Sequence, residues 1–239
     1  MTILVKSGIY NWSEIIMDNT PELIVMLTYN DMTVMDAASV FESIKDTDVK
    51  FVGMKEEPLP PEEMKKLYAR MKECGKTTAL EVVAYTEEEC MQGARLAAEC
   101  GVDILMGTIY SDAINDFCKE KGLKYMPFVG EVTERPSVLG GEIEDMINEA
   151  NSYIAKGAYG IDLLGYRYTG DAAELNRRLA AGVKAPVCIA GSVNSFERLD
   201  ELKEASPWAF TIGSAFFDKD FDEDIPTAVG KVCDYMKRV

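Results

Sequence analysis

The sequence predicts a closed (β/α)8 barrel, a single α/β domain in which eight parallel strands alternate with eight helices. Two observations carry this prediction. Apolar runs of strand length alternate with amphipathic helical patterns along the chain, mostly across short loops. The length of 239 residues is also typical of such barrels, which usually have about 250 residues. A doubly wound open sheet is the alternative that the same alternation allows.

The elements can be assigned in order along the chain. The strand-like runs are residues 23–29, 50–55, 77–84, 103–108, 124–130, 160–165, 186–190 and 209–213. The helical patterns are residues 35–45, 61–74, 87–100, 112–121, 142–156, 172–181, 195–205 and 226–237. Glycines such as Gly101 and Gly122 follow helical patterns, as left-handed C-terminal caps require, and Thr86 and Ser195 are good N-caps. We therefore expect one domain over residues 1–239, with residues 1–21 as an extension that closes the bottom of the barrel.

Composition narrows the range of partners. The net charge of −16 argues against a nucleic acid or an anionic membrane as a partner, and no apolar run is long enough to cross a bilayer. Six scattered cysteines without a C-x-x-C pair fit free thiols in a reducing compartment. We expect a cytoplasmic protein, and the sequence leaves a homodimer open.

The chain has no histidine, which removes the commonest general base and the commonest zinc ligand. Acid–base chemistry must therefore use Asp, Glu, Lys, Tyr or Cys. We expect no zinc, and any metal would be a hard cation such as Mg²⁺ on the carboxylates of Glu81 and Asp162. The first strand is not followed by G-x-G-x-x-G, which argues against a nicotinamide cofactor.

The ends of the last two strands predict a phosphate site. In both places an apolar run leads into a Gly-Ser pair, and the C-terminal ends of neighbouring parallel strands meet at the same mouth of a barrel. Glycines there leave backbone N–H groups free to surround an anion. The predicted phosphate ligands are Gly191, Ser192, Val193, Asn194, Gly213 and Ser214.

Charged side chains inside three strands predict a reacting centre. Because side chains alternate along a strand, an inward Lys55, Glu81 or Asp162 leaves apolar neighbours facing the helices. A buried charge is costly unless it is paired or used, so we expect the three to converge at the C-terminal mouth of the barrel as catalytic residues. An internal salt-bridge layer, or a solvated Lys55, would also fit the pattern.

Loops after the strands supply candidate substrate-binding residues. Tyr29 and Asp31 lie at the end of the first strand, and Glu131 lies at the end of the fifth. Arg135 lies midway in the longest loop, which ends in a Gly-Gly pair and is typical of a lid, and Arg167 follows the sixth strand. Either arginine could clamp an anion or simply face solvent.

The chain resembles the ribulose-phosphate-binding barrels, which include hexulose-phosphate synthases, orotidine-phosphate decarboxylases and acylglucosamine-phosphate epimerases. The resemblance rests on residues 81–108 and 157–216, and on the strand that ends at Lys55, which is similar to the lysine strand of the acylglucosamine-phosphate epimerases. The run 190–194 resembles the family pattern Ala-Gly-Gly-Ile-Asn. The third strand lacks the Asp-x-Lys-x-x-Asp motif of the synthases and decarboxylases and offers only Glu81.

The resemblance and the residues together predict a phosphorylated small-molecule substrate. The expected reaction is that of a phosphosugar isomerase, epimerase or aldolase-type lyase in carbohydrate metabolism, acting by proton transfer next to a carbonyl. The alternative is a non-catalytic protein that senses a phosphorylated metabolite.

Overall fold

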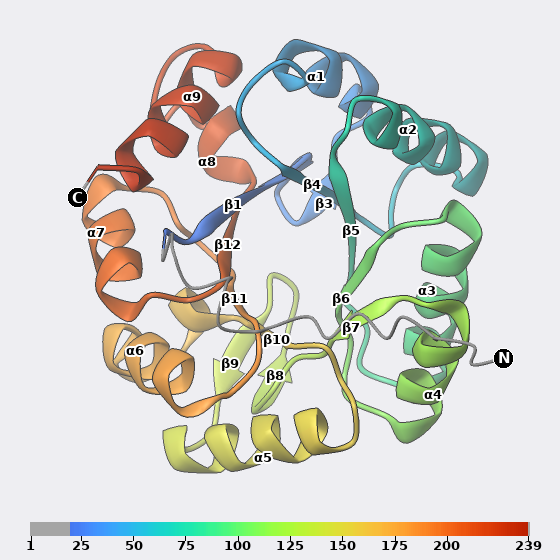
Figure 1. Ribbon diagram of the computed structural model, residues 1–239, viewed down its shortest axis with the longest axis vertical. Coiled ribbons are helices and arrows are strands. Elements are labelled where there is room, and N and C mark those ends of the chain that lie inside the picture. The colour runs from blue at the N-terminus through green and yellow to red at the C-terminus, as the bar shows by residue number, and fades with distance from the viewer. Residues whose placement is uncertain (1–19, 239) are drawn as a thin grey trace, which may run out of the picture.

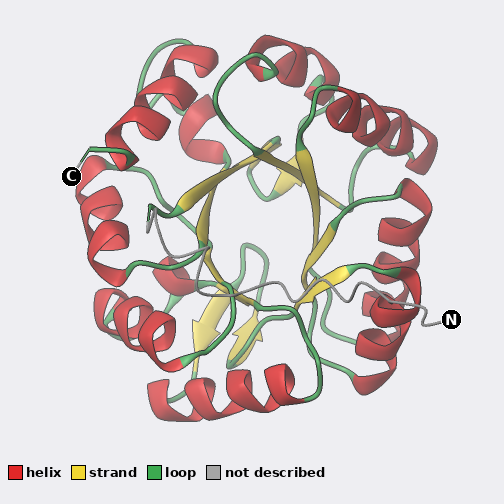
Figure 2. Ribbon diagram, in the orientation of Figure 1, coloured by secondary structure: helices red, strands yellow, loops and turns green. Residues whose placement is uncertain are grey.

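The computed structural model describes residues 20–238. The extension expected over residues 1–21 lies outside them except for its last two positions. Eight parallel strands form the inner ring and the helices cover its outside (Figure 1 and Figure 2). The strand order is β10-β11-β12-β1-β4-β5-β6-β7. The backbone N–H of Asp162 donates to the carbonyl of Pro127 (3.0 Å) and that of Tyr159 to Tyr125 (2.9 Å), which closes the ring between β10 and β7. The predicted closed barrel is therefore confirmed, and the open sheet is excluded.

The predicted strands all form, with shorter bounds at some ends. The barrel strands are β1 (Glu22–Met26), β4 (Phe51–Lys55), β5 (Thr77–Val82), β6 (Ile104–Gly107), β7 (Lys124–Met126), β10 (Ile161–Leu163), β11 (Val187–Ile189) and β12 (Ala209–Ile212).

The predicted helices also form. They are α1 (Ala37–Ile44), α2 (Pro61–Glu73), α3 (Glu87–Cys100), α4 (Asp112–Lys121), α5 (Ile143–Ala155), α6 (Ala172–Gly182), α7 (Phe196–Ala205) and α9 (Ile225–Met236). The cap predictions hold where they were made: the side chains of Thr86 and Ser195 accept backbone N–H groups of the first helical turn, and Gly101 and Gly122 adopt left-handed conformations.

Four smaller elements were not expected. Two hairpins rise from the barrel, β2 (Thr28–Tyr29) with β3 (Met32–Thr33), and β8 (Glu131–Thr133) with β9 (Val138–Gly140). The latter hairpin occupies the long loop in which a lid was predicted. A 3-10 turn, Gly165–Arg167, follows β10, and the short helix α8 (Ser214–Phe217) follows β12.

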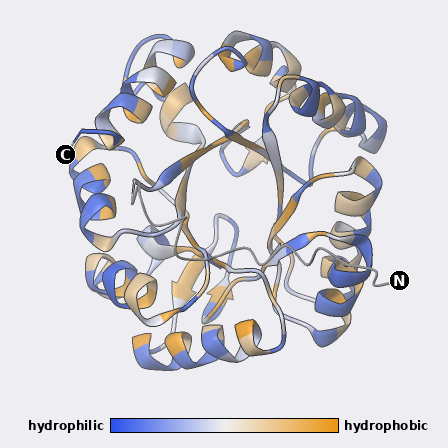
Figure 3. Cartoon of the chain, viewed as in Figure 1, coloured by the Kyte–Doolittle hydropathy of each residue, from blue (hydrophilic) through white to orange (hydrophobic). Residues whose placement is uncertain are grey.

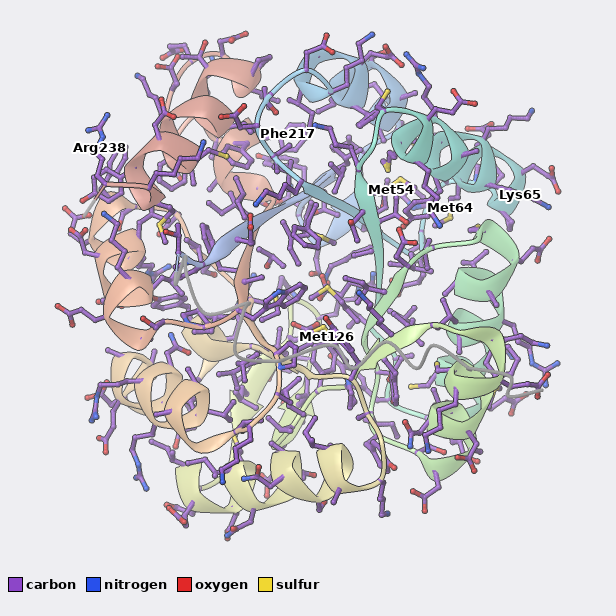
Figure 4. The ribbon with its side chains drawn as sticks, in the orientation of Figure 1. Met54, Met64, Lys65, Met126, Phe217 and Arg238 are labelled. Atoms are coloured by element: carbon purple, nitrogen blue, oxygen red, sulfur yellow. The ribbon has the colours of Figure 1, made fainter. Side chains whose placement is uncertain are left out.

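Apolar side chains divide into two layers. Met54 and Met64 pack in the outer layer between strands and helices, whereas Met126 belongs to the smaller cluster inside the ring (Figure 4). The helices turn their hydrophilic faces outward (Figure 3). No helix among residues 20–238 combines the length and apolar character that a membrane span requires.

Alternation along the strands decides which side chains reach the interior. Ile161 and Leu163 pack in the outer layer, so Asp162 between them faces inward as predicted. Ala79 packs in the inner cluster and Leu80 in the outer layer, which turns Glu81 inward. Val83 packs in the outer layer although it lies two residues after Glu81, because β5 ends at Val82 and the alternation ends with it.

Candidate active site

One cavity of about 190 Å³ lies among the loops that follow β1, β4, β5, β10, β11 and β12. Polar side chains and backbone from both predicted sites line it. Its walls include Lys55 and Glu81 from the ends of β4 and β5, and Arg167 from the 3-10 turn. The six predicted phosphate ligands all line it as well: Gly191, Ser192, Val193, Asn194, Gly213 and Ser214. The structure thus brings Lys55 and Glu81 of the predicted reacting centre into one cavity with the predicted phosphate loops.

Lys55 is the cation at the reacting end. Its residue is 7% exposed, and its Nζ lies 3.3 Å from Glu81 Oε1 and forms a hydrogen-bonded ion pair with Asp31 Oδ1. Burial by itself lowers the pKa of Lys55, but the charges of Glu81 and Asp31 outweigh it and the pKa is raised above its usual value. Lys55 is therefore an ammonium ion at neutral pH.

Register explains why Lys55 and Glu81 meet. Lys55 is paired with Glu81 across neighbouring parallel strands, both turned to the inside of the ring. The hydroxyl of Thr33 accepts from the Lys55 N–H and donates to the Lys55 carbonyl, both at 2.9 Å, which fixes the end of β4. The lysine is held by backbone contacts that do not depend on its charge.

Asp162 is placed differently from the prediction that it reaches the mouth. It is fully buried, does not line the cavity, and neither carboxylate oxygen has a hydrogen-bond partner among the described residues. Burial and then the charge of Glu81 raise the pKa of Asp162 well above its usual value, and the charge of Lys55 offsets only part of this. The surroundings of Asp162 therefore favour its protonated form. Cys188, its register partner on β11, is buried beside it, and burial raises the pKa of that thiol too.

The phosphate loops present unoccupied donors. Within residues 20–238, no protein acceptor is bonded to the backbone N–H groups of Gly191, Ser192, Val193, Asn194, Gly213, Ser214 or Ala215. Gly191 has φ +83°, and a Cβ there would lie 2.6 Å from Arg167 Cγ. At Gly213 a Cβ would lie 2.3 Å from Thr28 Oγ1. Both positions therefore require glycine, for conformation or for space.

Two carboxylates place negative charge beside the predicted phosphate loops. Asp218 and Asp220 also line the cavity, and burial followed by the charge of Asp218 raises the pKa of Asp220. The donors that would hold an anion are the backbone amides and Arg167, working against a negative rim.

The loop residues predicted to bind substrate differ in how they lie relative to the cavity. Asp31 and Arg167 line the cavity. Arg135, at the tip of the β8–β9 hairpin, does not line it but donates to Asp31 Oδ2 (3.1 Å) and pairs with Glu56 (3.3 Å) and Glu57 (2.7 Å). It therefore closes the hairpin over the mouth instead of presenting a free cation.

Tyr29 and Glu131 are not brought to the cavity. Tyr29 is 40% exposed on the β2–β3 hairpin, with its ring against Phe217. Glu131 starts β8 and faces a separate groove beside α5. Both were predicted because they end the first and fifth strands, but each lies on a hairpin, β2–β3 or β8–β9, that redirects the chain.

Two residues at the cavity were missed. Ser137 lines it from the β8–β9 hairpin, and Arg198 on α7 binds the phosphate loop from outside through Ser192 O and Asn194 Oδ1. The three-residue spacing from the cap Ser195 would have placed Arg198 in the first turn of α7, next to that loop.

Lys55 is the cation that pairs with Glu81, and its Nζ lies 3.3 Å from Glu81 Oε1. No group of three or more Asp, Glu, Cys or His side chains within residues 20–238 is arranged to hold a metal. Mg²⁺ at Glu81 and Asp162 stays a prediction, and the chemistry proposed below uses no metal.

Comparison with known proteins supports the assignment of the fold. No protein-family model and no curated protein sequence matches the chain. Solved structures match at low identity. Tryptophan synthase from M. tuberculosis has a TM-score of 0.66 and 12% identity over 93% of this chain and 95% of that chain.

Two further solved structures are similar to this chain in fold. A 4-hydroxy-2-oxoglutarate/2-dehydro-3-deoxyphosphogluconate aldolase from TTHB1 has a TM-score of 0.61 and 14% identity over 90% and 92% of the two chains. The N-acetylmannosamine-6-phosphate 2-epimerase from Clostridium perfringens has a TM-score of 0.60 and 12% identity over 95% and 97%. At these identities the likeness establishes a shared architecture: the chain has the (β/α)8 barrel fold of these enzymes over nearly its whole length.

Proposed function

We propose that the protein is an isomerase or epimerase, or an aldolase-type lyase, that transfers a proton next to the carbonyl group of a small phosphorylated substrate. The observation that carries this proposal is the shared cavity, which has free backbone amides of two strand-end loops on one side and the Lys55–Glu81–Asp31 cluster on the other. The neighbours in structure include an aldolase of a phosphogluconate derivative and an epimerase of a 6-phosphate sugar.

Backbone amides suit the phosphate end. Several N–H groups that converge on one point bind a tetrahedral anion without a matching buried cation. Arg167 adds one positive charge at the same wall of the cavity. Because the chain carries a net charge of −16, such a local site is needed to hold an anion at all.

The charge on Lys55 indicates its role. A raised pKa keeps the amine protonated, and a protonated amine cannot attack a carbonyl to form an imine. The ammonium ion can instead donate a hydrogen bond to the substrate carbonyl and stabilise the enolate oxygen that forms when the neighbouring C–H bond loses its proton. Lys55 thus favours isomerase or epimerase chemistry over an imine-forming lyase.

A carboxylate beside Lys55 would take the proton. Glu81 and Asp31 both contact the ammonium and line the cavity, so either lies where a C–H group next to the bound carbonyl would be. Returning that proton to the former carbonyl carbon, while the proton of the adjacent hydroxyl moves to the former carbonyl oxygen, gives isomerisation. Returning a proton to the opposite face of the original carbon gives epimerisation. Asp162 would act indirectly, from its buried position behind Glu81.

The second candidate function is a non-catalytic sensor of a phosphorylated metabolite. It needs the phosphate loops but not the buried cluster. The unpartnered Asp162 and the buried Lys55 are costly features for a protein that only binds, and this favours the enzyme.

The test is exchange of solvent deuterium into phosphorylated sugars that raise the melting temperature. We expect at least one such ligand to take up deuterium at the carbon next to its carbonyl, and NMR would detect this exchange. Lys55→Met should abolish exchange and keep phosphate binding, whereas the control Lys65→Met, on the outer face of α2, should change neither (Figure 4). Ligands that bind without any exchange would establish the sensor, and absence of binding by every phosphorylated ligand would refute both functions.

A further inference from the structure

We infer that Arg198 is a positioning residue that holds the phosphate loop 191–194 in its binding conformation through a bracket with Tyr166. The inference rests on the proposed function, because it explains how the phosphate side of that cavity is kept ready. Arg198 does not line the cavity and reaches the loop from α7. Its effect on substrate would therefore pass through the loop.

The loop needs an external restraint. Gly191 and Ser192 both have positive φ, +83° and +54°. For a serine this conformation is uncommon, because the Cβ approaches the following carbonyl oxygen. Burial anchors the loop at Val193 alone, because Ser192 and Asn194 on either side of it are exposed. A loop with four free N–H groups also has few hydrogen bonds of its own.

Arg198 supplies that restraint at two points. Its Nη1 donates to the carbonyl of Ser192 and to Asn194 Oδ1, the latter at 3.0 Å. In a planar trans peptide the C=O and the following N–H point in opposite directions. Holding the Ser192 carbonyl toward α7 therefore turns the Val193 N–H away from α7, to the side on which the loop lines the cavity.

Tyr166 in turn holds Arg198. The guanidinium lies 4.8 Å from the centre of the Tyr166 ring, and the Tyr166 hydroxyl donates to the backbone carbonyl of Arg198 (3.2 Å). Tyr166 is the neighbour of Arg167, which lines the cavity and packs against Gly191. The 3-10 turn after β10 and the first turn of α7 thus form one clamp around the loop after β11.

A positioning role and a direct ionic role make different predictions. If Arg198 acts through the loop, loss of the Tyr166 ring disturbs it even though the charge remains. If Arg198 attracts the anion only through its charge, Tyr166→Leu changes nothing, and any arginine of similar exposure contributes as much. Arg178 on α6 is the matched control, since it pairs with Glu144 and Glu174 away from the cavity.

The experiment measures binding of inorganic phosphate by calorimetry to the wild type, Arg198→Met, Arg198→Lys, Tyr166→Leu, the double variant and Arg178→Met. We expect Arg198→Met to weaken binding about tenfold, the size expected for loss of charge-assisted hydrogen bonds. Tyr166→Leu should weaken it severalfold, the double variant no more than Arg198→Met, and Arg178→Met not at all. Arg198→Lys, which keeps one donor, should recover part of the loss.

With the substrate found by deuterium exchange, Arg198→Met and Tyr166→Leu should raise KM and leave kcat unchanged, and Arg178→Met should change neither. A wild type that binds phosphate together with an unaffected Arg198→Met overturns this inference alone. Additive effects of Arg198→Met and Tyr166→Leu, or an equal loss in Arg178→Met, also overturn the inference that Tyr166 and Arg198 act together on the loop. A wild type that binds no phosphate overturns the phosphate site and the inference that rests on it.

Discussion

Lys55→Met should destabilise the protein by an amount that depends on pH. In the native structure Lys55 neutralises two buried carboxylates. Asp31 keeps Arg135 as a partner after the substitution, at 3.1 Å, but Glu81 has no other ion pair among the described residues. Glu81 would be left as a buried, unpaired carboxylate, a situation that costs about 3–5 kcal/mol.

Protonation sets an upper limit to that cost. A glutamate in water has a pKa of about 4.3, so protonating it at pH 7 costs about 3.7 kcal/mol at 1.36 kcal/mol per pKa unit. The limit falls to about 1 kcal/mol at pH 5. In the variant the folded state holds this proton more tightly than the unfolded state, so stability is lost as pH rises above the unfolded value.

The assay is urea unfolding of the wild type and Lys55→Met at pH 5, 6, 7 and 8. The difference in unfolding free energy should grow from about 1 kcal/mol at pH 5 to about 3–4 kcal/mol at pH 7. Adding Glu81→Gln to the variant should remove most of the pH dependence, and Lys65→Met should follow the wild type. A loss of equal size at every pH would refute the reasoning, since it would indicate lost packing instead of an unpaired charge.

Three further substitutions test other parts of the site. Burial raises the pKa of Asp162, so its contribution to stability is present below about pH 4 and is lost as pH rises. The melting temperature of Asp162→Asn should therefore rise relative to that of the wild type between pH 4 and pH 8. A difference in melting temperature that stays constant with pH would contradict a buried titrating acid. Gly213→Ala would place a Cβ 2.3 Å from Thr28 Oγ1 and should weaken phosphate binding at least tenfold, whereas Gly230→Ala, where the Cβ meets open space, should bind normally in the same calorimetry. Arg135→Met should lower stability by less than about 1 kcal/mol, because the side chain is partly exposed, but should speed cleavage after Glu134 by a glutamyl protease; unchanged cleavage would show that the arginine does not hold the hairpin closed.

The barrel and its two strand-borne sites could be predicted because they depend on local patterns. Alternation of apolar residues placed Glu81 and Asp162 inside the ring, and the glycines after β11 and β12 marked the phosphate loops. These signals lie within a few residues of the atoms they position.

The loop residues were harder to predict because hairpins decide their direction. Asp31 reaches Lys55 only because β2 and β3 fold back over the mouth. Arg135 meets Asp31 from 104 residues away, a pairing that no sequence pattern indicates. Asp162 was expected at the mouth because strand parity gives the direction of a side chain and not its depth.

The two ends of the cavity are specified by different parts of the polypeptide. The phosphate end uses peptide groups, which every residue except proline carries in the same form, and it is sensitive to substitution mainly where glycine is needed. The reacting end depends on the identity of three side chains, Asp31, Lys55 and Glu81. Changes at those three positions could give a new reaction to a protein that still recognises its substrates by the same phosphate handle, so specificity for the anion and choice of chemistry can diverge separately in this chain.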